Sequence, residues 1–214
     1  MSTLCIEAWG SGTPVLLIHG SLATGQEEWE AQQPLAEEGY RLLALDRRGY
    51  GQSPAAKGED FLQDADDVVE LKGDGVHLVG HSYGGMAAMF AAARRPEATL
   101  SLALFEPPAF SLAQHDRAAR ALVSRIQEMW DLDLSDGEWG KRFLRAVGTE
   151  PEALPPELLE QIVPLVPLLR HGRTLFWSSQ SGHIFKPQLP IQSPSASGSP
   201  GSSGAGSCCT PSRC

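Results

Sequence analysis

The residues of this chain best suited to chemistry lie in one short glycine-rich run. Ser82 stands within Gly80-His81-Ser82-Tyr83-Gly84-Gly85, after the apolar segment 76–79 and before a small-residue stretch that Pro96 closes. A serine flanked by glycines between a buried strand and a helix is typical of a nucleophile elbow, where a tight turn lifts the hydroxyl above the sheet. N–H groups at the helix start then point to where an oxyanion would form. We predict that Ser82 is a nucleophile; the alternative is a structural glycine-rich turn.

Apolar runs that alternate with amphipathic stretches predict the elements that position this serine. Short apolar runs indicate strands, and apolar residues at helical spacing indicate helices. The predicted strands are 4–9, 15–18, 41–45, 76–79 and 100–105, and the predicted helices are 26–39, 60–71 and 83–95. Buried strands separated by helices indicate an α/β fold with a mostly parallel sheet covered on both faces.

The pattern changes after Glu106. Three helical stretches, at 111–130, 137–147 and 156–170, follow one another without a strand between them. We interpret them as a helical lid inserted over the edge of the sheet. Its largest apolar residues either line a pocket or pack the lid's own core. They are Met129, Trp130, Trp139 and Phe143.

The last part of the chain has a different composition again. All 26 acidic residues lie at or before Glu160, and Ser, Gly and Pro dominate from Ser193 onward. Such a segment buries too little apolar surface to fold, so we expect disorder. The predicted organisation is a core at 1–106, a lid at 107–175 and a disordered tail at 176–214. A reading-frame shift near the end of the lid would explain the tail, and a natural disordered tail is the alternative.

Composition narrows the range of partners. The chain has 214 residues and a formal charge of −9, without a basic cluster or an apolar run of the ~20 residues that a membrane span needs. We therefore expect a small-molecule substrate rather than nucleic acid or a membrane. No signal peptide is visible, so a cytoplasmic location is expected. The four cysteines form no metal-ligand pattern, and we expect neither a metal nor a cofactor.

Three motifs together resemble the α/β-hydrolase superfamily. They are the Ser82 run, His19-Gly20 after the strand at 15–18, and Asp46-Arg47-Arg48-Gly49-Tyr50-Gly51-Gln52-Ser53 after the strand at 41–45. The resemblance is close over residues 4–110. It implies that the backbone N–H groups of Ser21 and Tyr83 form the oxyanion hole and that His19 braces their loop. It also implies that Asp46 and Arg48 brace the loop after their strand.

The resemblance leaves the rest of a catalytic triad incomplete. The family places its acid after the seventh strand or, in some branches, after the sixth. No acidic residue follows Glu160, so Glu106, directly after the strand at 100–105, is the predicted acid. Its alternative role is to hydrogen-bond the following proline turn. The family's histidine base follows an eighth strand that is not recognisable here, which leaves His115, His171 and His183 as candidates.

Two functional hypotheses follow. The first is a serine hydrolase that cleaves an ester or another activated carbonyl; a haloperoxidase-like enzyme or a carbon–carbon bond hydrolase would differ only in substrate. The second is a catalytically impaired or non-catalytic remnant of a hydrolase fold. The intact Ser82 run favours the first, and the unrecognised strands and base favour the second. A dinucleotide-binding fold is disfavoured because no Gly-x-Gly-x-x-Gly run opens the first helix.

Overall fold

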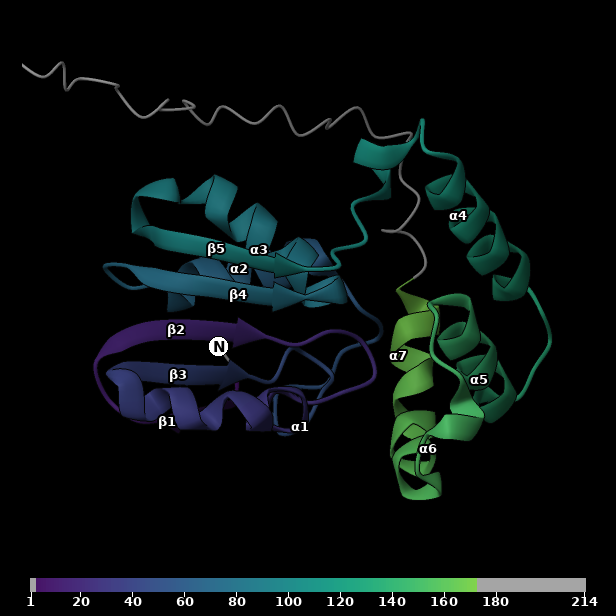
Figure 1. Ribbon diagram of the computed structural model, residues 1–214, viewed down its shortest axis with the longest axis horizontal. Helices are drawn as coiled ribbons and strands as arrows, with labels where there is room; N and C mark the ends of the chain where they lie inside the picture. Colours follow the sequence, from purple (N-terminus) through teal and green to yellow (C-terminus); the bar gives the residue numbers. More distant parts are fainter. Residues whose placement is uncertain (1–2, 173–214) are drawn as a thin grey trace, which may run out of the picture. The chain divides into compact units, whose positions relative to one another are not determined.

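The computed structural model describes residues 3–172, so the tail predicted at 176–214 lies outside the described residues. Five strands form one sheet in the order β1-β3-β2-β4-β5. The strands β2 (Thr13–Ile18), β3 (Tyr40–Leu45), β4 (Val76–His81) and β5 (Thr99–Phe105) are parallel, and β1 (Ile6–Trp9) is antiparallel to β3. The arrowheads of the four parallel strands point the same way in Figure 1. The predicted mostly parallel α/β sheet is confirmed.

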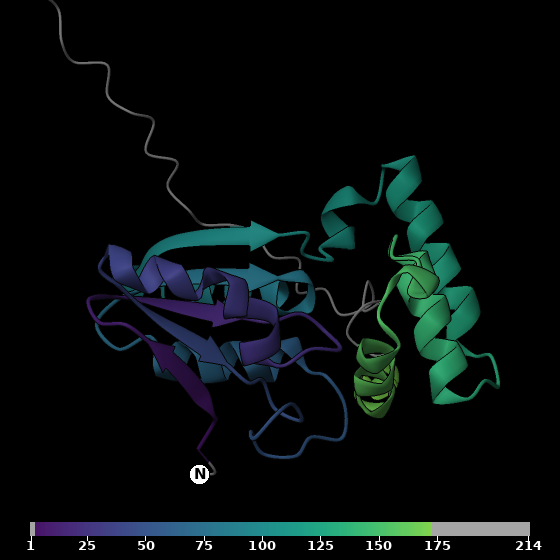
Figure 2. The same ribbon diagram turned by 60° about the horizontal axis from the view of Figure 1, so that its bottom comes forward.

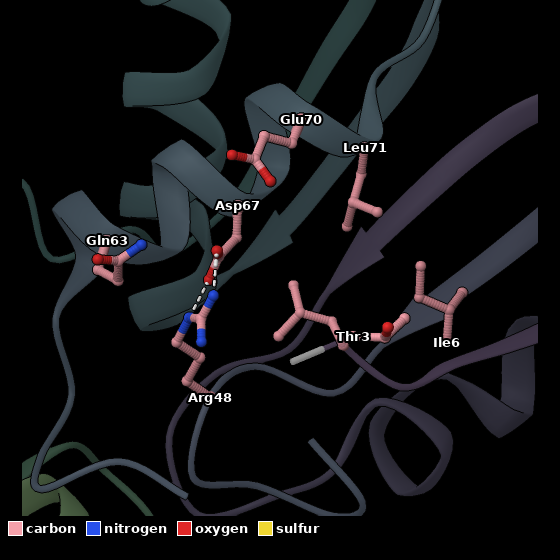
Figure 3. Close-up of a pocket in the computed structure, with 8 residues that line it drawn as sticks. Thr3, Ile6, Arg48, Gln63, Asp67, Glu70 and Leu71 are labelled. Carbon is pink, nitrogen blue, oxygen red and sulfur yellow. Dashed lines mark hydrogen bonds and ion pairs between the residues drawn. The ribbon is translucent and has the colours of Figure 1, made fainter. Parts of the chain in front are cut away.

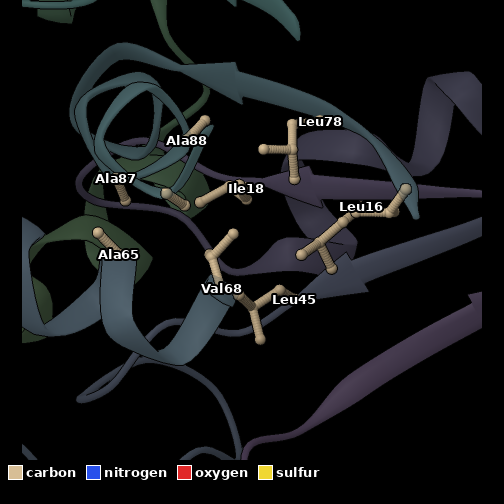
Figure 4. Close-up of a cluster of buried hydrophobic side chains, with 10 residues drawn as sticks. Leu16, Ile18, Leu45, Ala65, Val68, Leu78, Ala87 and Ala88 are labelled. Atoms are coloured by element: carbon tan, nitrogen blue, oxygen red, sulfur yellow. The ribbon is translucent and has the colours of Figure 1, made fainter. Parts of the chain in front are cut away.

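Side chains that alternate along the strands build a core on each face of the sheet. Leu16 and Ile18 of β2 face the helices α2 (Phe61–Leu71) and α3 (Ser82–Arg94). Figure 4 shows this cluster, in which alanines of α3 let the helix lie close to the strands. The intervening residues Val15 and Leu17 pack on the other face with Trp29 of α1 (Gly25–Trp29). This period of two is what strands impose, and it places helices on both faces (Figures 1 and 2).

The helix predicted at 26–39 is divided into two elements. Thr24 and Glu27 form a capping box at the start of α1, and a 3₁₀ helix (Glu30–Glu38) follows it directly. Pro34 lies inside the second element, where it provides no N–H and its ring obstructs regular α-helical packing. Gly39 ends the segment with a φ of +85°, a left-handed conformation that glycine adopts without strain.

The segment after β5 is helical, as predicted, but the helices expected at 111–130 and at 156–170 are each divided into shorter elements. It begins with a 3₁₀ helix (Phe110–Ala113) and contains α4 (Arg117–Trp130), α5 (Asp136–Ala146), α6 (Pro156–Ile162) and α7 (Val166–His171), with 3₁₀ turns at Pro151–Ala153 and Val163–Leu165. Prolines at the starts of the Val163–Leu165 turn and of α7 break the predicted helix at 156–170. Within residues 3–172, no helix is both long and apolar enough to cross a membrane.

The large apolar side chains of this segment pack against one another. Trp139 is fully buried, edge-on to Trp130 at 5.1 Å and stacked on Phe143 at 5.6 Å between ring centroids. Met129 is buried in the same cluster. These four residues therefore pack the segment's own core, the second of the two roles considered from the sequence.

Contacts with the loops of the sheet connect the helical segment to the rest of the molecule. Leu22, in the connection between β2 and α1, is buried in the cluster formed by α4 to α7. The backbone N–H of Glu59, in the connection between β3 and α2, donates to the carbonyl of Leu168 in α7 at 3.1 Å. The sheet and the helical segment belong to one compact unit.

Candidate active site

Ser82 lies at the junction between a strand and a helix. It is the first residue of α3, and His81, the last residue of β4, precedes it in extended conformation. Ser82 itself has a φ of +48°, which is rare for a residue with a side chain. Such strain persists only where the surroundings enforce it, and it concentrates at functional sites. The side chain is half-buried rather than sealed in the core.

Glycines allow this junction to pack tightly. A Cβ at Gly84 would lie 2.3 Å from the carbonyl oxygen of His19, and one at Gly80 would lie 2.7 Å from the Cα of Gly85. Both separations are too short for any side chain. The start of α3 therefore rests directly on the backbone at the end of β2, which only glycine permits.

The loop after β2 approaches the same junction. A Cβ on Gly20 would lie 3.1 Å from the Cβ of Ser82, so the Gly20 backbone lies against the serine. Ser21 follows Gly20, and Leu22 has a φ of +68°. Tyr83 belongs to the first turn of α3, where N–H groups point out from the start of the helix. Of the two predicted oxyanion residues, Tyr83 follows Ser82 directly in the chain, and Ser21 belongs to the loop whose Gly20 lies against Ser82.

A buried arginine forms hydrogen bonds with the backbone of the loop after β2. Arg47 donates from Nε to the carbonyl of His19 at 3.0 Å and from Nη2 to the carbonyl of Gly20 at 2.9 Å. Its guanidinium also pairs with Glu59 at 2.7 Å and with Asp64 at 2.9 Å. Glu59 accepts in addition from Tyr50 Oη at 2.7 Å and from Ser21 Oγ at 2.8 Å. The network joins the loops after β2 and β3 to the start of α2.

Burial changes the protonation of this network. Two carboxylates share one guanidinium, and burial raises the pKa of Asp64 to about 6 although Arg47 opposes the shift. His19 is fully buried; burial, together with the charge of Arg47, lowers its pKa well below the ordinary value. Its ring donates from Nδ1 to the carbonyl of Gly20 and accepts at Nε2 from the backbone N–H of Arg47. A neutral ring with both nitrogens occupied braces the loop.

Glu106 directly follows β5, as Ser82 directly follows β4. His81 pairs with Phe105 in the parallel register of β4 and β5, and Ser82 and Glu106 are the next residue on each strand. Neighbouring strands are about 4.8 Å apart. Glu106 also has a positive φ, +48°, and its side chain is exposed. The predicted acid therefore follows the strand that neighbours the strand of the predicted nucleophile, at the same edge of the sheet.

In the part of the chain that the structure describes, neither histidine proposed as the base hydrogen-bonds Ser82 or Glu106. His171 is exposed and its Nδ1 bonds to the carbonyl of Pro167, one turn earlier in its own helix. His115 is exposed at the end of the first 3₁₀ turn of the helical segment. Across residues 3–172, no histidine ring hydrogen-bonds Ser82 or Glu106. His183 lies outside the described residues.

His81, which directly precedes Ser82, forms an ion pair. Its Nδ1 lies 3.1 Å from Oε1 of Glu28 in α1. The hydrogen bond with Glu28 raises the His81 pKa above its ordinary value, partial burial opposes this shift, and the charges of Glu28 and Glu106 support it. A titrating imidazole thus sits one residue before Ser82.

The loop residues predicted after β3 make the contacts of a brace, but the central arginine was missed. Asp46 accepts from the backbone N–H of Gly25 at 2.9 Å and of Gln52 at 3.0 Å. Arg48 forms a two-bond pair with Asp67 of α2. Arg47, the buried one, was passed over, although Asp64 and Asp67 at i and i+3 on one helix offered the signal. Two acids on one face of a helix, together with two adjacent arginines in the preceding loop, indicate that these charges are paired.

A shallow hollow elsewhere on the molecule is separate from this site. It has a volume of about 430 Å³ and lies between β1 and α2, with the Arg48–Asp67 pair at its wall (Figure 3). None of its lining residues comes from the junctions that hold Ser21, Ser82 or Glu106. Within the described part of the chain, no three His, Cys, Asp or Glu residues cluster as a metal site would require.

Comparisons with known proteins show which fold family the chain matches. A family model described as alpha/beta hydrolase fold matches residues 13–136. The chain is 45% identical over 83 residues to a non-heme chloroperoxidase of Kitasatospora aureofaciens, covering 36% of this chain and 30% of that protein. It therefore spans about a third of the length of that relative.

Longer matches extend beyond the sheet. Lipase LipV of Mycobacterium tuberculosis is 30% identical over 200 residues, covering 87% of this chain and 74% of the lipase. A match of that extent has to continue past Ser181, so the similarity reaches into the segment expected to be foreign to the fold. The solved structure of the N-acyl homoserine lactonase AidH superposes with a TM-score of 0.59 at 22% identity, over 82% of this chain and 66% of that one, which establishes the fold alone.

Proposed function

This chain belongs to the alpha/beta hydrolase family, and on that premise we propose that it cleaves a small-molecule ester or another activated carbonyl with Ser82 as nucleophile. The observation that carries the proposal is the positive φ of Ser82 at the end of β4, against the backbone of Gly20. Acyl transfer requires an accessible nucleophile and backbone N–H groups that stabilise the developing negative oxygen. Ser82 would be the nucleophile, and the start of α3 and the loop after β2 would provide the N–H groups.

Each residue then has a defined step. Ser82 Oγ attacks the carbonyl carbon and gives its proton to a base. The N–H groups of Ser21 and Tyr83 stabilise the negative oxygen of the tetrahedral intermediate. The protonated base gives its proton to the leaving oxygen, so the intermediate expels an alcohol. The base then takes a proton from the water that attacks the acyl-enzyme, and returns it to Ser82 Oγ as the acid is released. Glu106 orients the base and stabilises its protonated form, and His183 is the base we propose because neither His115 nor His171 hydrogen-bonds Ser82 or Glu106.

The rival proposal is a catalytically impaired hydrolase fold. Two observations favour it: no histidine ring within residues 3–172 hydrogen-bonds Ser82, and β5 pairs only with β4 among the strands described. A serine without a base is a weak nucleophile. The helical segment serves as the lid under either proposal, since Leu22 connects it to the loop of Ser21.

Hydrolysis of short-chain p-nitrophenyl esters separates the two proposals. A competent hydrolase turns over at a rate near the common enzyme value of about 10 per second, and Ser82→Ala reduces turnover to the uncatalysed background. Folded wild-type protein that stays at the background rate with every chain length would favour the impaired remnant. The carbon-chain dependence of the rate identifies the substrate class.

A further inference from the structure

The carboxylate of Glu28 joins the two loops that meet at Ser82. Both of its oxygens accept from the backbone N–H of Gly20, at 3.1 and 3.0 Å. Oε1 also lies 3.1 Å from Nδ1 of His81. Glu28 comes from a third element, α1, so one side chain connects the loop after β2 with the end of β4.

The Glu28 contacts fix the residues that directly precede Ser21 and Ser82. Gly20 directly precedes Ser21, and His81 directly precedes Ser82. A Cβ on Gly20 would lie 3.0 Å from His81 Nδ1 and 3.1 Å from Ser82 Cβ, so the two loops are already in close contact. A small displacement of Gly20 therefore changes where the Ser21 N–H points relative to the Ser82 hydroxyl.

The surroundings of His81 favour its charged form. Glu28 faces it from α1 and Glu106 acts on it from the end of β5, and both carboxylates stabilise the imidazolium. His19 faces it from the end of β2 and is held neutral by burial and Arg47. Side-chain exposure is 40% for His81 and 16% for Glu28, so the pair is accessible to solvent and to titration.

We propose that Glu28 is a positioning residue, which holds the oxyanion loop against Ser82 through Gly20 and His81. The proposal rests on the proposed function, because the position of Ser21 matters only if Ser82 reacts. Glu28 itself touches neither the substrate nor the reacting atoms. Its contribution is greatest when His81 is protonated, because the carboxylate then binds a cation as well as the Gly20 N–H.

The test uses three substitutions in the full chain. Glu28→Gln keeps an acceptor for Gly20 and removes the charge, whereas Glu28→Ala removes both. Glu30→Gln is the matched control, because Glu30 is an exposed acid two residues further along with the same change of charge. The two readouts are the pKa of His81, from imidazole carbon–proton NMR shifts, and the rate of Ser82 labelling by a fluorophosphonate across pH.

The expected result has three parts. The His81 pKa falls in Glu28→Gln and stays unchanged in Glu30→Gln. Glu28→Ala labels about tenfold more slowly than wild type, which is less than the hundredfold or more lost when an oxyanion donor is deleted outright. Glu28→Gln labels more slowly than wild type between the two His81 pKa values, and the rates converge above the wild-type value. A merely structural role would slow labelling equally at every pH.

Two further outcomes overturn the proposal and remain distinguishable. If wild type and both Glu28 variants label at the same rate, Glu28 does not position the loop, while the nucleophile stands. If folded wild-type protein does not label at any pH, the proposed function fails, and the positioning role falls with it whatever the NMR titration shows.

Discussion

Three residues other than glycine have a positive φ within residues 3–172: Leu22, Ser82 and Glu106. Each lies in a connection that follows a parallel strand, so the strain gathers at one edge of the sheet. Each such conformation costs about 1–3 kcal/mol and persists only where surrounding packing enforces it. The predicted nucleophile, the predicted acid and the oxyanion loop each contribute one. This coincidence supports a shared site.

The role of Glu106 is testable by an isosteric change. If Glu106 orients the base, Glu106→Gln lowers ester turnover by about three to four orders of magnitude and leaves the thermal midpoint nearly unchanged. The exposed Glu97, just before β5, provides the control Glu97→Gln. A loss of only a few-fold would assign Glu106 to the turn at Pro107.

Asp64 gives the stability of the protein a pH dependence. Because its pKa rises from the ordinary 3.8 to about 6 on folding, the native state binds a proton that the unfolded chain has released between those values. Stability therefore falls as pH rises from about 4 to about 6, by at most ~3 kcal/mol at 1.36 kcal/mol per pKa unit.

Urea unfolding at several pH values measures this effect. In Asp64→Asn the fall between pH 4 and 6 is reduced, because the titrating group is gone. Asp74→Asn, at an exposed loop position, keeps the wild-type slope. A wild-type stability that rises across this interval would refute the assignment.

At the scale of elements, the contact between α3 and β2 depends on Gly84. A methyl group there would overlap the backbone oxygens of Ile18 and His19, which cannot move without shifting the strand. We expect Gly84→Ala to destabilise the fold by about 3 kcal/mol. Gly137 in α5 is the control, since a Cβ there meets only Val163 at 3.8 Å.

Gly137→Ala should instead stabilise the protein by about 0.5–1 kcal/mol, because alanine restricts the unfolded chain and suits a helix. Chemical unfolding of the two variants side by side gives both values. Equal effects of the two substitutions would mean that α3 does not rest on β2 as described.

Elements with strong periodicity could be predicted from the sequence, and those shaped by tertiary contacts could not. The apolar run at 15–18 predicts a strand that is buried on both faces of the sheet, and its residues pack alternately into the cores on the two faces. The amphipathic helix predicted at 60–71 is present as Phe61–Leu71, with the Asp60 side chain capping its first turn. The single helix expected at 26–39 was wrong, since Pro34 has a stronger effect than the helical pattern.

The candidate site was predicted only in part, for a similar reason. Local motifs indicate Ser82 and the loop of Ser21 because glycine spacing encodes backbone shape. The Arg47 network and the Glu28–His81 pair join residues that are far apart in sequence. A local pattern, such as Asp64 and Asp67 on one helix face, indicates that charges are paired but does not identify the partner. The base was predicted only as a set of candidates, of which His183 lies outside the described residues.

At the scale of the whole molecule, β5 is the less protected of the two edge strands in the sheet that the structure describes. Among the described strands it pairs only with β4, and its residues Thr99–Phe105 include neither a charge nor a proline. Leu100 and Phe105 are each 54% exposed and Leu102 is 38% exposed. Uncharged apolar edges of this kind pair with other chains. We expect the protein to self-associate as its concentration rises.

Leu102→Lys should reduce this association, because a charge on the edge opposes pairing with a second strand. Leu112→Lys is the control, since Leu112 is 68% exposed in the helical segment and lies off the sheet. Light scattering against concentration measures both variants. A wild-type protein that stays monomeric at all concentrations would show that β5 is covered in solution.

The most direct test of the central claim is covalent labelling of Ser82. Folded wild-type protein is treated with a fluorophosphonate, and intact-mass and peptide mass spectrometry locate the adduct. We predict one adduct, on the peptide that contains Ser82, and none on a Ser82→Ala variant with the same circular dichroism spectrum. Equal labelling of the alanine variant, or a folded wild-type protein that takes no label, would contradict the assignment of Ser82 as the nucleophile.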